Sequence, residues 1–170
     1  MSNLTDASQS RIILMPAAEA IGPWRTLALA LARGGHRLAF ADASQGLDDQ
    51  LRDLQFEVER AGGISLAGPA DDPAWAREAF GALDLVLTPS PGEAAREAER
   101  CFKGQPKATG GRNPAPLRRV VLLTPEPGAV EPCVVKRTSA GTGATLWRVS
   151  APAPLSTRAA EQIAERITQP

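Results

Sequence analysis

The chain has 170 residues, of which 19 are Lys or Arg and 19 are Asp or Glu, so its formal net charge is zero. Hydrophobic residues make up 43% of the chain and charged residues 22%, the balance of a folded globular domain rather than of a disordered segment. A zero net charge argues against general binding to nucleic acid or to anionic membranes, which needs an excess of positive charge. The length predicts one domain with its own core.

Residue types and apolar runs predict neither a metal site nor a membrane span. The two cysteines, Cys101 and Cys133, have no metal-ligand spacing, and His36 is the single histidine, which we expect in a polar turn. No apolar run approaches the roughly 18 residues that a transmembrane helix requires. Residues 1–10 are polar and predict a frayed tail without a signal peptide, so we expect a cytoplasmic protein with free thiols.

The first half of the chain alternates short apolar runs with helical patterns that end near glycines. This alternation predicts an α/β fold, in which a parallel sheet carries helices on both faces. Residues 16–22 are predicted to form a turn, and Pro23 suits the first position of the helix that follows. The expected strands are 11–15, 37–41, 64–67 and 83–87, and the expected helices are 24–33, 47–61 and 72–80.

The second half of the chain is less regular. A short helix is predicted at 92–102 and a fifth buried strand at 120–123. Residues 103–119 hold six Gly or Pro and five Lys or Arg but no acid, which predicts a mobile basic loop. This loop is either simply solvated or in contact with an acidic partner or a nucleotide phosphate.

The last 40 residues leave one alternative open. Residues 133–137 and 144–149 form either a hairpin or a broken helix followed by a sixth strand. A final helix is predicted at 158–167, with Ser156 or Thr157 as its N-cap.

Several segments resemble the short-chain dehydrogenase/reductase family. The resemblance implies a Rossmann-like, doubly wound parallel sheet formed by residues 11–170 as a single domain. Because the chain is shorter than a full family member, we expect this sheet to be shortened in its second half. The similar segments are Ile21–Gly22, 27–33, 34–42, 61–63, 69–71, 80–87, 117–123 and 147–154.

The cofactor loop of that family has the form Thr-Gly-x-x-x-Gly-x-Gly, and this chain departs from it. Aligned on Gly22, the first two glycines are replaced by Pro16 and Ala20. Proline lacks a backbone N–H, and the Cβ of Ala20 stands where the backbone would approach a diphosphate. Glu19 adds a negative charge beside that place. Gly22 keeps the role of close helix–strand packing, so the loop retains its structural glycine and loses the binding ones.

The resemblance also assigns candidate residues for the adenosine half of a nucleotide. Asp42 follows Gly22 by 20 residues, where a ribose-binding acid is expected. Asp71 stands where the family contacts the adenine. The alternative interpretation is that Asp42 is an ordinary acid at a strand end and Asp71 one at a helix start.

The catalytic residues of the family are missing or displaced. Pro125 aligns with the catalytic serine, with Thr124 beside it, and Lys136 is the nearest remnant of the family's Tyr-x-x-x-Lys pair. The chain contains no tyrosine, so it cannot supply a phenol as general acid under any alignment. Trp24 follows Pro23 at the place of the diphosphate, where its indole is predicted to fill or cover the crevice.

Three hypotheses follow from these substitutions. The first is a non-catalytic relative that has no cofactor and docks onto a protein partner, such as a full-length dehydrogenase or a larger assembly, as a structural or regulatory subunit. The second is a sensor that binds an adenine nucleotide such as NAD(P) through Gly22, Asp42 and Asp71. The third is a residual oxidoreductase that uses Thr124 and Lys136.

Overall fold

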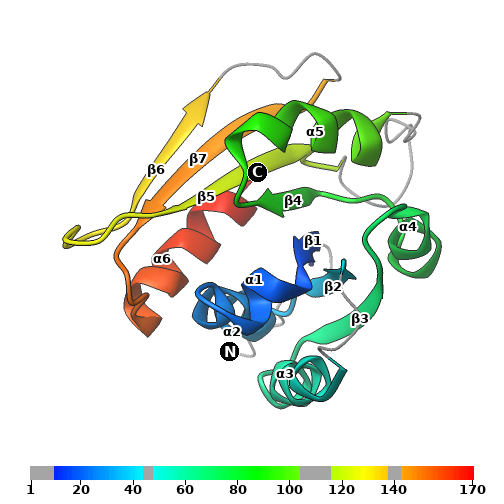
Figure 1. The fold of residues 1–170 in the computed structure, drawn as a ribbon, viewed down its shortest axis with the longest axis horizontal. Helices are drawn as coiled ribbons and strands as arrows, with labels where there is room; N and C mark the ends of the chain where they lie inside the picture. Colours follow the sequence, from blue (N-terminus) through cyan, green and yellow to red (C-terminus); the bar gives the residue numbers. More distant parts are fainter. Residues whose placement is uncertain (1–9, 44–47, 104–115, 138–142) are drawn as a thin grey trace, which may run out of the picture.

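The protein folds around one seven-stranded sheet with the strand order β3-β2-β1-β4-β5-β7-β6 (Figure 1). The computed structural model describes residues 10–43, 48–103, 116–137 and 143–170. The strands are β1 (Ile12–Pro16), β2 (Arg37–Asp42), β3 (Ile64–Pro69), β4 (Leu85–Thr88), β5 (Arg119–Pro125), β6 (Cys133–Arg137) and β7 (Thr145–Ala151). The helices are α1 (Ala17–Ile21), α2 (Arg25–Arg33), α3 (Asp48–Arg60), α4 (Ala74–Phe80), α5 (Ala94–Phe102) and α6 (Thr157–Thr168), with a 3-10 turn, η2 (Pro91–Glu93), before α5.

Within the described residues, every strand pair is parallel except β6 with β7, which confirms the predicted Rossmann-like α/β fold. Helices α1, α2, α3 and α6 cover one face of the sheet, and α4 and α5 cover the other (Figure 1). Each face has its own buried apolar cluster. The larger cluster joins Ile13 and Leu38 of the sheet to Leu27 of α2 and Ile163 of α6.

Within the predicted turn at 16–22, residues Ala17–Ile21 form helix α1 directly after the strand-end Pro16, so the predicted turn is wrong. Three alanines in a five-residue segment supply high helix propensity, and two of them, Ala17 and Ala20, are completely buried against the sheet. Pro16 takes an extended conformation that suits the residue before a helix. Proline and glycine at the ends of the segment favour a turn locally, but burial of the alanines against the sheet stabilises a helix.

The alternative left open at 133–149 is decided in favour of an antiparallel strand pair. Strand β6 pairs with β7 from Cys133 opposite Ser150 to Arg137 opposite Leu146, and β7 also pairs in parallel with β5. The connecting residues 138–142 lie outside the described residues, as do residues 104–115 of the predicted basic loop and 1–9 of the predicted tail.

The last helix forms as predicted. The Ser156 hydroxyl accepts a hydrogen bond of 3.1 Å from the amide of Ala159, which identifies Ser156 as the N-cap. Helix α6 then lies beside α2, where Ile163 and Ile167 are completely buried. In the described part of the chain, no helix has the length and apolar content to cross a membrane.

Candidate functional site

In a doubly wound sheet, ligands bind at the carboxyl ends of the strands. The crevice lies between the two neighbouring strands from which the chain continues toward opposite edges of the sheet. In this protein that point lies between β1 and β4, since the chain proceeds outward from β1 through β2 and β3 on one side and through β4 and β5 on the other. The elements at this edge are α1, the turn at 22–24 and the ends of the strands. Their side chains decide what the crevice can hold.

The backbone amides just after α1 are bonded within the protein. The amide of Gly22 donates to the carbonyl of Ala18 at 3.0 Å, and that of Trp24 donates to the carbonyl of Glu19 at 3.0 Å. The amide of Arg25 donates to the carbonyl of Gly22 at 3.2 Å, and Pro23 has no amide hydrogen. These three positions after α1 therefore offer no free amide to a diphosphate.

Gly22 has a different role from the predicted one. A Cβ atom at this position would lie 2.9 Å from the carbonyl oxygen of Ala18, a contact that real side chains do not make. The glycine is required because the chain folds back against the end of α1, rather than for packing a helix against a strand. This role is structural and needs no ligand.

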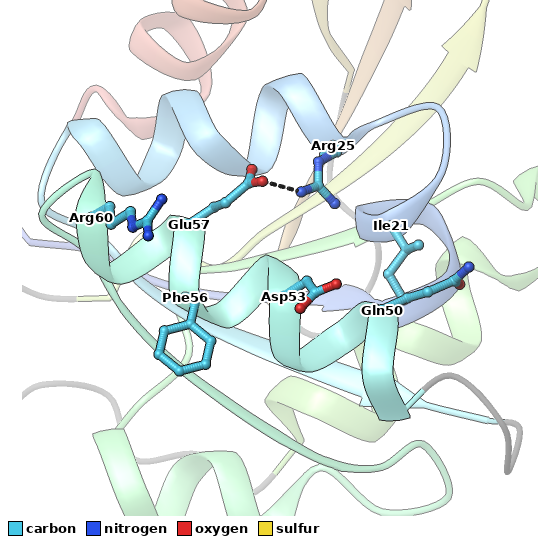
Figure 2. Close-up of a pocket in the computed structure, with 7 residues that line it drawn as sticks. All are labelled: Ile21, Arg25, Gln50, Asp53, Phe56, Glu57 and Arg60. Atoms are coloured by element: carbon cyan, nitrogen blue, oxygen red, sulfur yellow. Dashed lines mark ion pairs between the residues drawn. The ribbon is translucent and has the colours of Figure 1, made fainter.

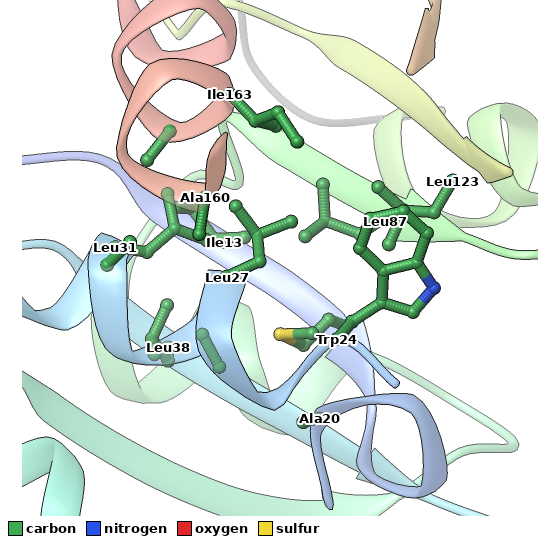
Figure 3. Packing of buried hydrophobic residues seen from close by; sticks show 14 of the residues in the cluster. Ile13, Ala20, Trp24, Leu27, Leu31, Leu38, Leu87, Leu123, Ala160 and Ile163 are labelled. Atoms are coloured by element: carbon green, nitrogen blue, oxygen red, sulfur yellow. The ribbon is translucent and has the colours of Figure 1, made fainter. Parts of the chain in front are cut away.

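Trp24 is buried in the apolar cluster beneath this turn, with only 2% of its surface exposed. Figure 3 shows its indole pointing toward Leu87 near the end of β4 and Leu123 near the end of β5. The indole ring thus fills space at the carboxyl ends of β4 and β5. This placement agrees with the prediction that Trp24 fills the crevice.

The structure brings Asp42 and Asp71 to the same edge of the sheet. Asp42 ends β2 opposite Pro69, and its carbonyl accepts a hydrogen bond of 3.1 Å from the amide of Ala70. Asp71 is exposed in the bend after β3. The neighbouring Asp72 accepts a hydrogen bond of 2.9 Å from the amide of Ala74 at the start of α4, so that acid, and not Asp71, serves the helix start.

Thr124 and Lys136 are not brought together. Thr124 lies near the end of β5 opposite Ser150 of β7, which in turn lies opposite Cys133 of β6. Lys136 is exposed on β6 opposite Trp147, three residues along the strand from Cys133. Strand β7 lies between β6 and β5, so the lysine and Thr124 are on strands that are not neighbours. The lysine stands on a strand, so it cannot belong to a helical Tyr-x-x-x-Lys pair.

The most polar buried cluster lies at the opposite, amino-terminal edge of the sheet, and sequence reasoning missed it. The Asp84 carboxylate accepts hydrogen bonds of 2.9 Å from the amides of Ile12 and Leu117, and Arg11 lies 3.8 Å from it. Burial raises the pKa of Asp84 above its ordinary value, although these amides and the Arg11 and Arg119 charges oppose the shift. The available signal was an acid inside the apolar run at 83–87.

His36 belongs to the same edge and is buried rather than part of a solvated turn. Its Nδ1 accepts a hydrogen bond of 2.9 Å from the Arg11 amide, and the residue is 9% exposed. Burial, with a contribution from the Arg11 charge, lowers the pKa of His36 to about 4. The ring is therefore a neutral acceptor at neutral pH, in a structural role.

An open hollow of about 520 Å³ lies on the helical face, between α1, α2 and α3. Figure 2 shows that Arg25 and Glu57 face one another across it, and their ion pair measures 2.7 Å. The hollow is lined by Ile21, Arg25, Gln50, Asp53, Phe56, Glu57 and Arg60. Its two arginines and two acids together carry no formal net charge.

No metal centre accompanies these features: the described residues contain no group of three or more His, Cys, Asp or Glu side chains that could hold an ion. The two thiols also differ in environment. Cys101 is completely buried, and burial together with the Glu97 charge raises its thiol pKa to about 12, whereas Cys133 is exposed on β6. The Cys101 thiol donates a long hydrogen bond of 3.8 Å to Oε2 of Glu97, four residues earlier on α5.

Of three comparisons with known proteins, only the comparison with solved structures finds similar proteins, and these share the α/β architecture. No protein-family model matches the sequence, and no curated protein matches it at a significant level. Among solved structures, a short-chain dehydrogenase from Oenococcus oeni matches with a TM-score of 0.52 at 12% identity, covering 70% of this chain and 63% of that one. A putative dehydrogenase from Xanthomonas campestris matches with a TM-score of 0.46 at 21% identity, covering 71% of this chain and 54% of that one.

A third similar structure is the FolM alternative dihydrofolate reductase 1 from Brucella canis, solved in complex with NADP. It matches with a TM-score of 0.49 at 16% identity, covering 69% of this chain and 56% of that one. The chain thus spans between 54% and 63% of the length of these three structures. The likeness to the Oenococcus structure, together with the strand order, shows a Rossmann-like α/β fold that is shorter than the fold of that short-chain dehydrogenase.

Proposed function

We propose that the protein is a non-catalytic relative of the short-chain dehydrogenases that acts as a structural or regulatory subunit of a larger assembly. One observation carries the proposal: Trp24 is buried at the carboxyl ends of β4 and β5, in the place where such a fold would receive its ligand. Core packing has replaced an open crevice there.

The residues at this crevice do not fit a dinucleotide. A diphosphate needs free backbone amides and no competing negative charge, because the helix start binds it through N–H groups. Here the amides of Gly22, Trp24 and Arg25 are bonded to carbonyls of the same segment, and Glu19 lies within α1. We therefore infer that this crevice does not hold a nicotinamide dinucleotide.

The catalytic groups of the family support the same proposal. The sequence holds no tyrosine, and Thr124 and Lys136 stand on strands separated by β7. Reduction of a carbonyl needs a proton donor within hydrogen-bond reach of the forming alkoxide, which these two residues cannot provide jointly. In this proposal, the folded domain acts by binding a protein partner rather than by catalysis.

Two measurements test the proposal together. Isothermal titration with NAD⁺, NADP⁺ and their reduced forms at millimolar concentration should show no binding, with a full-length short-chain dehydrogenase as positive control. Native mass spectrometry of the protein isolated gently from its source cells should show a heavier complex with a defined stoichiometry. A lone chain without a partner, or nicotinamide-dependent turnover that Lys136→Ala abolishes, would overturn it.

A second candidate function is an adenine-nucleotide sensor, favoured by the placement of Asp42 and Asp71 at the same edge of neighbouring strands. It predicts saturable binding of an adenine nucleotide that Asp42→Ala weakens at least tenfold. The matched control is Asp49→Ala, because Asp49 is exposed on α3. Binding that responds to neither change would argue against a site at these acids.

A further inference from the structure

Strand β3 is an edge strand with an unusual composition. It ends the sheet next to β2, and its sequence, Ile-Ser-Leu-Ala-Gly-Pro, contains no charge. Ile64 is 54% exposed and Leu66 is 39% exposed, and both lie on the same face of the strand because side chains alternate. Natural sheets protect their edges with charges or coverage, so a neutral edge with exposed apolar side chains indicates pairing with another strand.

The direction of the backbone groups on β3 follows from one hydrogen bond. The amide of Ala70 donates to the carbonyl of Asp42 on β2, so alternation turns the amides and carbonyls of Ile64, Leu66 and Gly68 toward β2 as well. The corresponding groups of Ser65 and Ala67 point away from the sheet. No described residue bonds to them.

The free stretch of this edge is bounded at both ends. At the start, the amide of Gly63 is bonded to the carbonyl of Val58 at 3.0 Å. At the end, Pro69 has no amide, and its carbonyl accepts a hydrogen bond of 2.9 Å from Nε1 of Trp75. The outward groups of Ser65 and Ala67 therefore form the open part of the edge.

We propose that a second copy of this chain pairs with β3 in antiparallel orientation, with Leu66 on the two-fold axis. In this register Ser65 of each copy faces Ala67 of the other, and the two pairs exchange about four hydrogen bonds. Leu66 meets Leu66 of the second copy as a non-hydrogen-bonded pair, the arrangement in which side chains approach most closely. The inference does not depend on the proposed function.

The same register places Ile64 opposite Gly68 of the second copy. The ring of Trp75 lies over Gly68, where an added Cβ would be 2.4 Å from the ring atoms. Ile64 of one copy would therefore pack against the half-buried indole of the other, which covers apolar surface on both.

Charge complementarity favours a second copy over a strand of other origin. Arg60 ends α3 just before the strand, and Asp71 and Asp72 follow it; all three are exposed. An antiparallel pairing about Leu66 brings the amino end of β3, beside Arg60, to the carboxyl end of β3 in the second copy, beside Asp71 and Asp72, and this approach occurs twice by symmetry. A parallel arrangement would bring like charges together instead.

The opposite edge of the sheet lacks these features. Strand β6 carries Lys136 and Arg137, the charges that protect an edge, although Val135 on it is 43% exposed. Val135 is thus a matched control position for Leu66: both are apolar, similarly exposed and on an edge strand.

The first test is the oligomeric state by analytical ultracentrifugation. We expect a concentration-dependent dimer whose dissociation constant rises at least tenfold in Leu66→Lys and changes less than twofold in Val135→Lys, with circular dichroism showing that both remain folded. Arg60→Glu should weaken the dimer, and the added change Asp71→Lys should restore it. A monomer up to high micromolar concentration, or equal effects of the two lysine variants, would overturn the proposal.

A second test reads the register through cysteine pairs in a Cys133→Ser background. Leu66→Cys should form an intermolecular disulfide under mild oxidation, since Cα atoms of a non-hydrogen-bonded pair lie roughly 4.5 Å apart. Ile64→Cys should not, because its own symmetry mate would be displaced by four residues, roughly 14 Å along the strand. Cross-linking of Ile64→Cys alone, or pairing of β3 with a strand of another protein in place of itself, would contradict this proposal.

Discussion

Nη1 of Arg119, at the start of β5, donates a hydrogen bond of 2.8 Å to the carbonyl of Ile167, near the end of α6. Nε of Arg11, the residue before β1, donates a second hydrogen bond of 3.2 Å to the carbonyl of Thr168. Unpaired carbonyls at a helix end carry partial negative charge, so two guanidinium groups stabilise α6 there. Asp84 interacts with both arginines and offsets part of their positive charge.

Replacing Arg119 by Met should lower the free energy of unfolding by about 1–3 kcal/mol, because a buried carbonyl loses its donor and Asp84 loses a cation. The contact of the guanidinium with the Trp147 ring, 4.4 Å from its centroid, is lost as well. Urea unfolding measures the change. The control is Arg33→Met, whose exposed pair with Glu161 at 3.7 Å should contribute at most about 0.5 kcal/mol. Equal effects of both variants would contradict this role for Arg119.

The stability of the protein should fall between pH 6.5 and pH 4 because of His36. Its pKa is lowered to about 4 in the folded state, so in this range the unfolded chain binds the proton and the folded protein does not. The neutral His36 ring makes its full contribution to the free energy of unfolding above about pH 6.5, and about 2 kcal/mol of this contribution is lost at pH 5. The raised pKa of Asp84 acts in the opposite direction, since there the folded state binds the proton more readily.

The variant His36→Asn isolates this effect, because the Asn side-chain oxygen can replace Nδ1 as the acceptor of the Arg11 amide but does not titrate. Urea unfolding at pH 7 and pH 5 should show a smaller loss for the variant than for the parent protein. The same loss in both proteins would assign the acid sensitivity to other groups.

Thiol labelling should distinguish the two cysteines. Cys133 is exposed and should react with a disulfide reagent within minutes at pH 8, whereas Cys101 is buried with its pKa raised to about 12 and should react only after unfolding. Cys133→Ser should leave no fast-reacting thiol. Rapid labelling of two thiols in the folded protein would contradict the burial of Cys101.

Truncating Trp24 tests whether the crevice is filled by core packing. Trp24→Ala should lower the free energy of unfolding by about 3–5 kcal/mol, because the change removes a buried aromatic ring and leaves a cavity. Phe56→Ala is the control, since Phe56 is 59% exposed on α3 and its loss should change stability little. An effect of Trp24→Ala as small as that of the control would mean that the indole does not hold the crevice closed.

The regular elements were predictable because their signals are local. Apolar runs at 37–41 and 120–123, and the helical spacing with a serine cap at 156, each depend on residues within one element. The segment 133–149 resisted prediction, because whether residues with strand propensity pair depends on the neighbouring β5 and β7.

The candidate site was predictable only in its chemistry. The lack of tyrosine and the substitutions at Pro16 and Ala20 are visible in the sequence. The spacing of residues in the sequence did not determine that Trp24 is buried, or that the amides of Gly22 and Trp24 bond to carbonyls of α1. A turn and a short helix are both compatible with residues 16–22.

The sequence by itself therefore determined the alternation of strands and helices and the absence of a phenol, because neither depends on how distant segments meet. Only the tertiary structure decided the rest. Asp84 reaches Leu117 across 33 positions and Arg119 reaches Ile167 across 48, while β3 becomes an edge because the order of strands places no neighbour beyond it. These features arise from contacts between segments far apart in the chain, which periodicity and propensity do not encode.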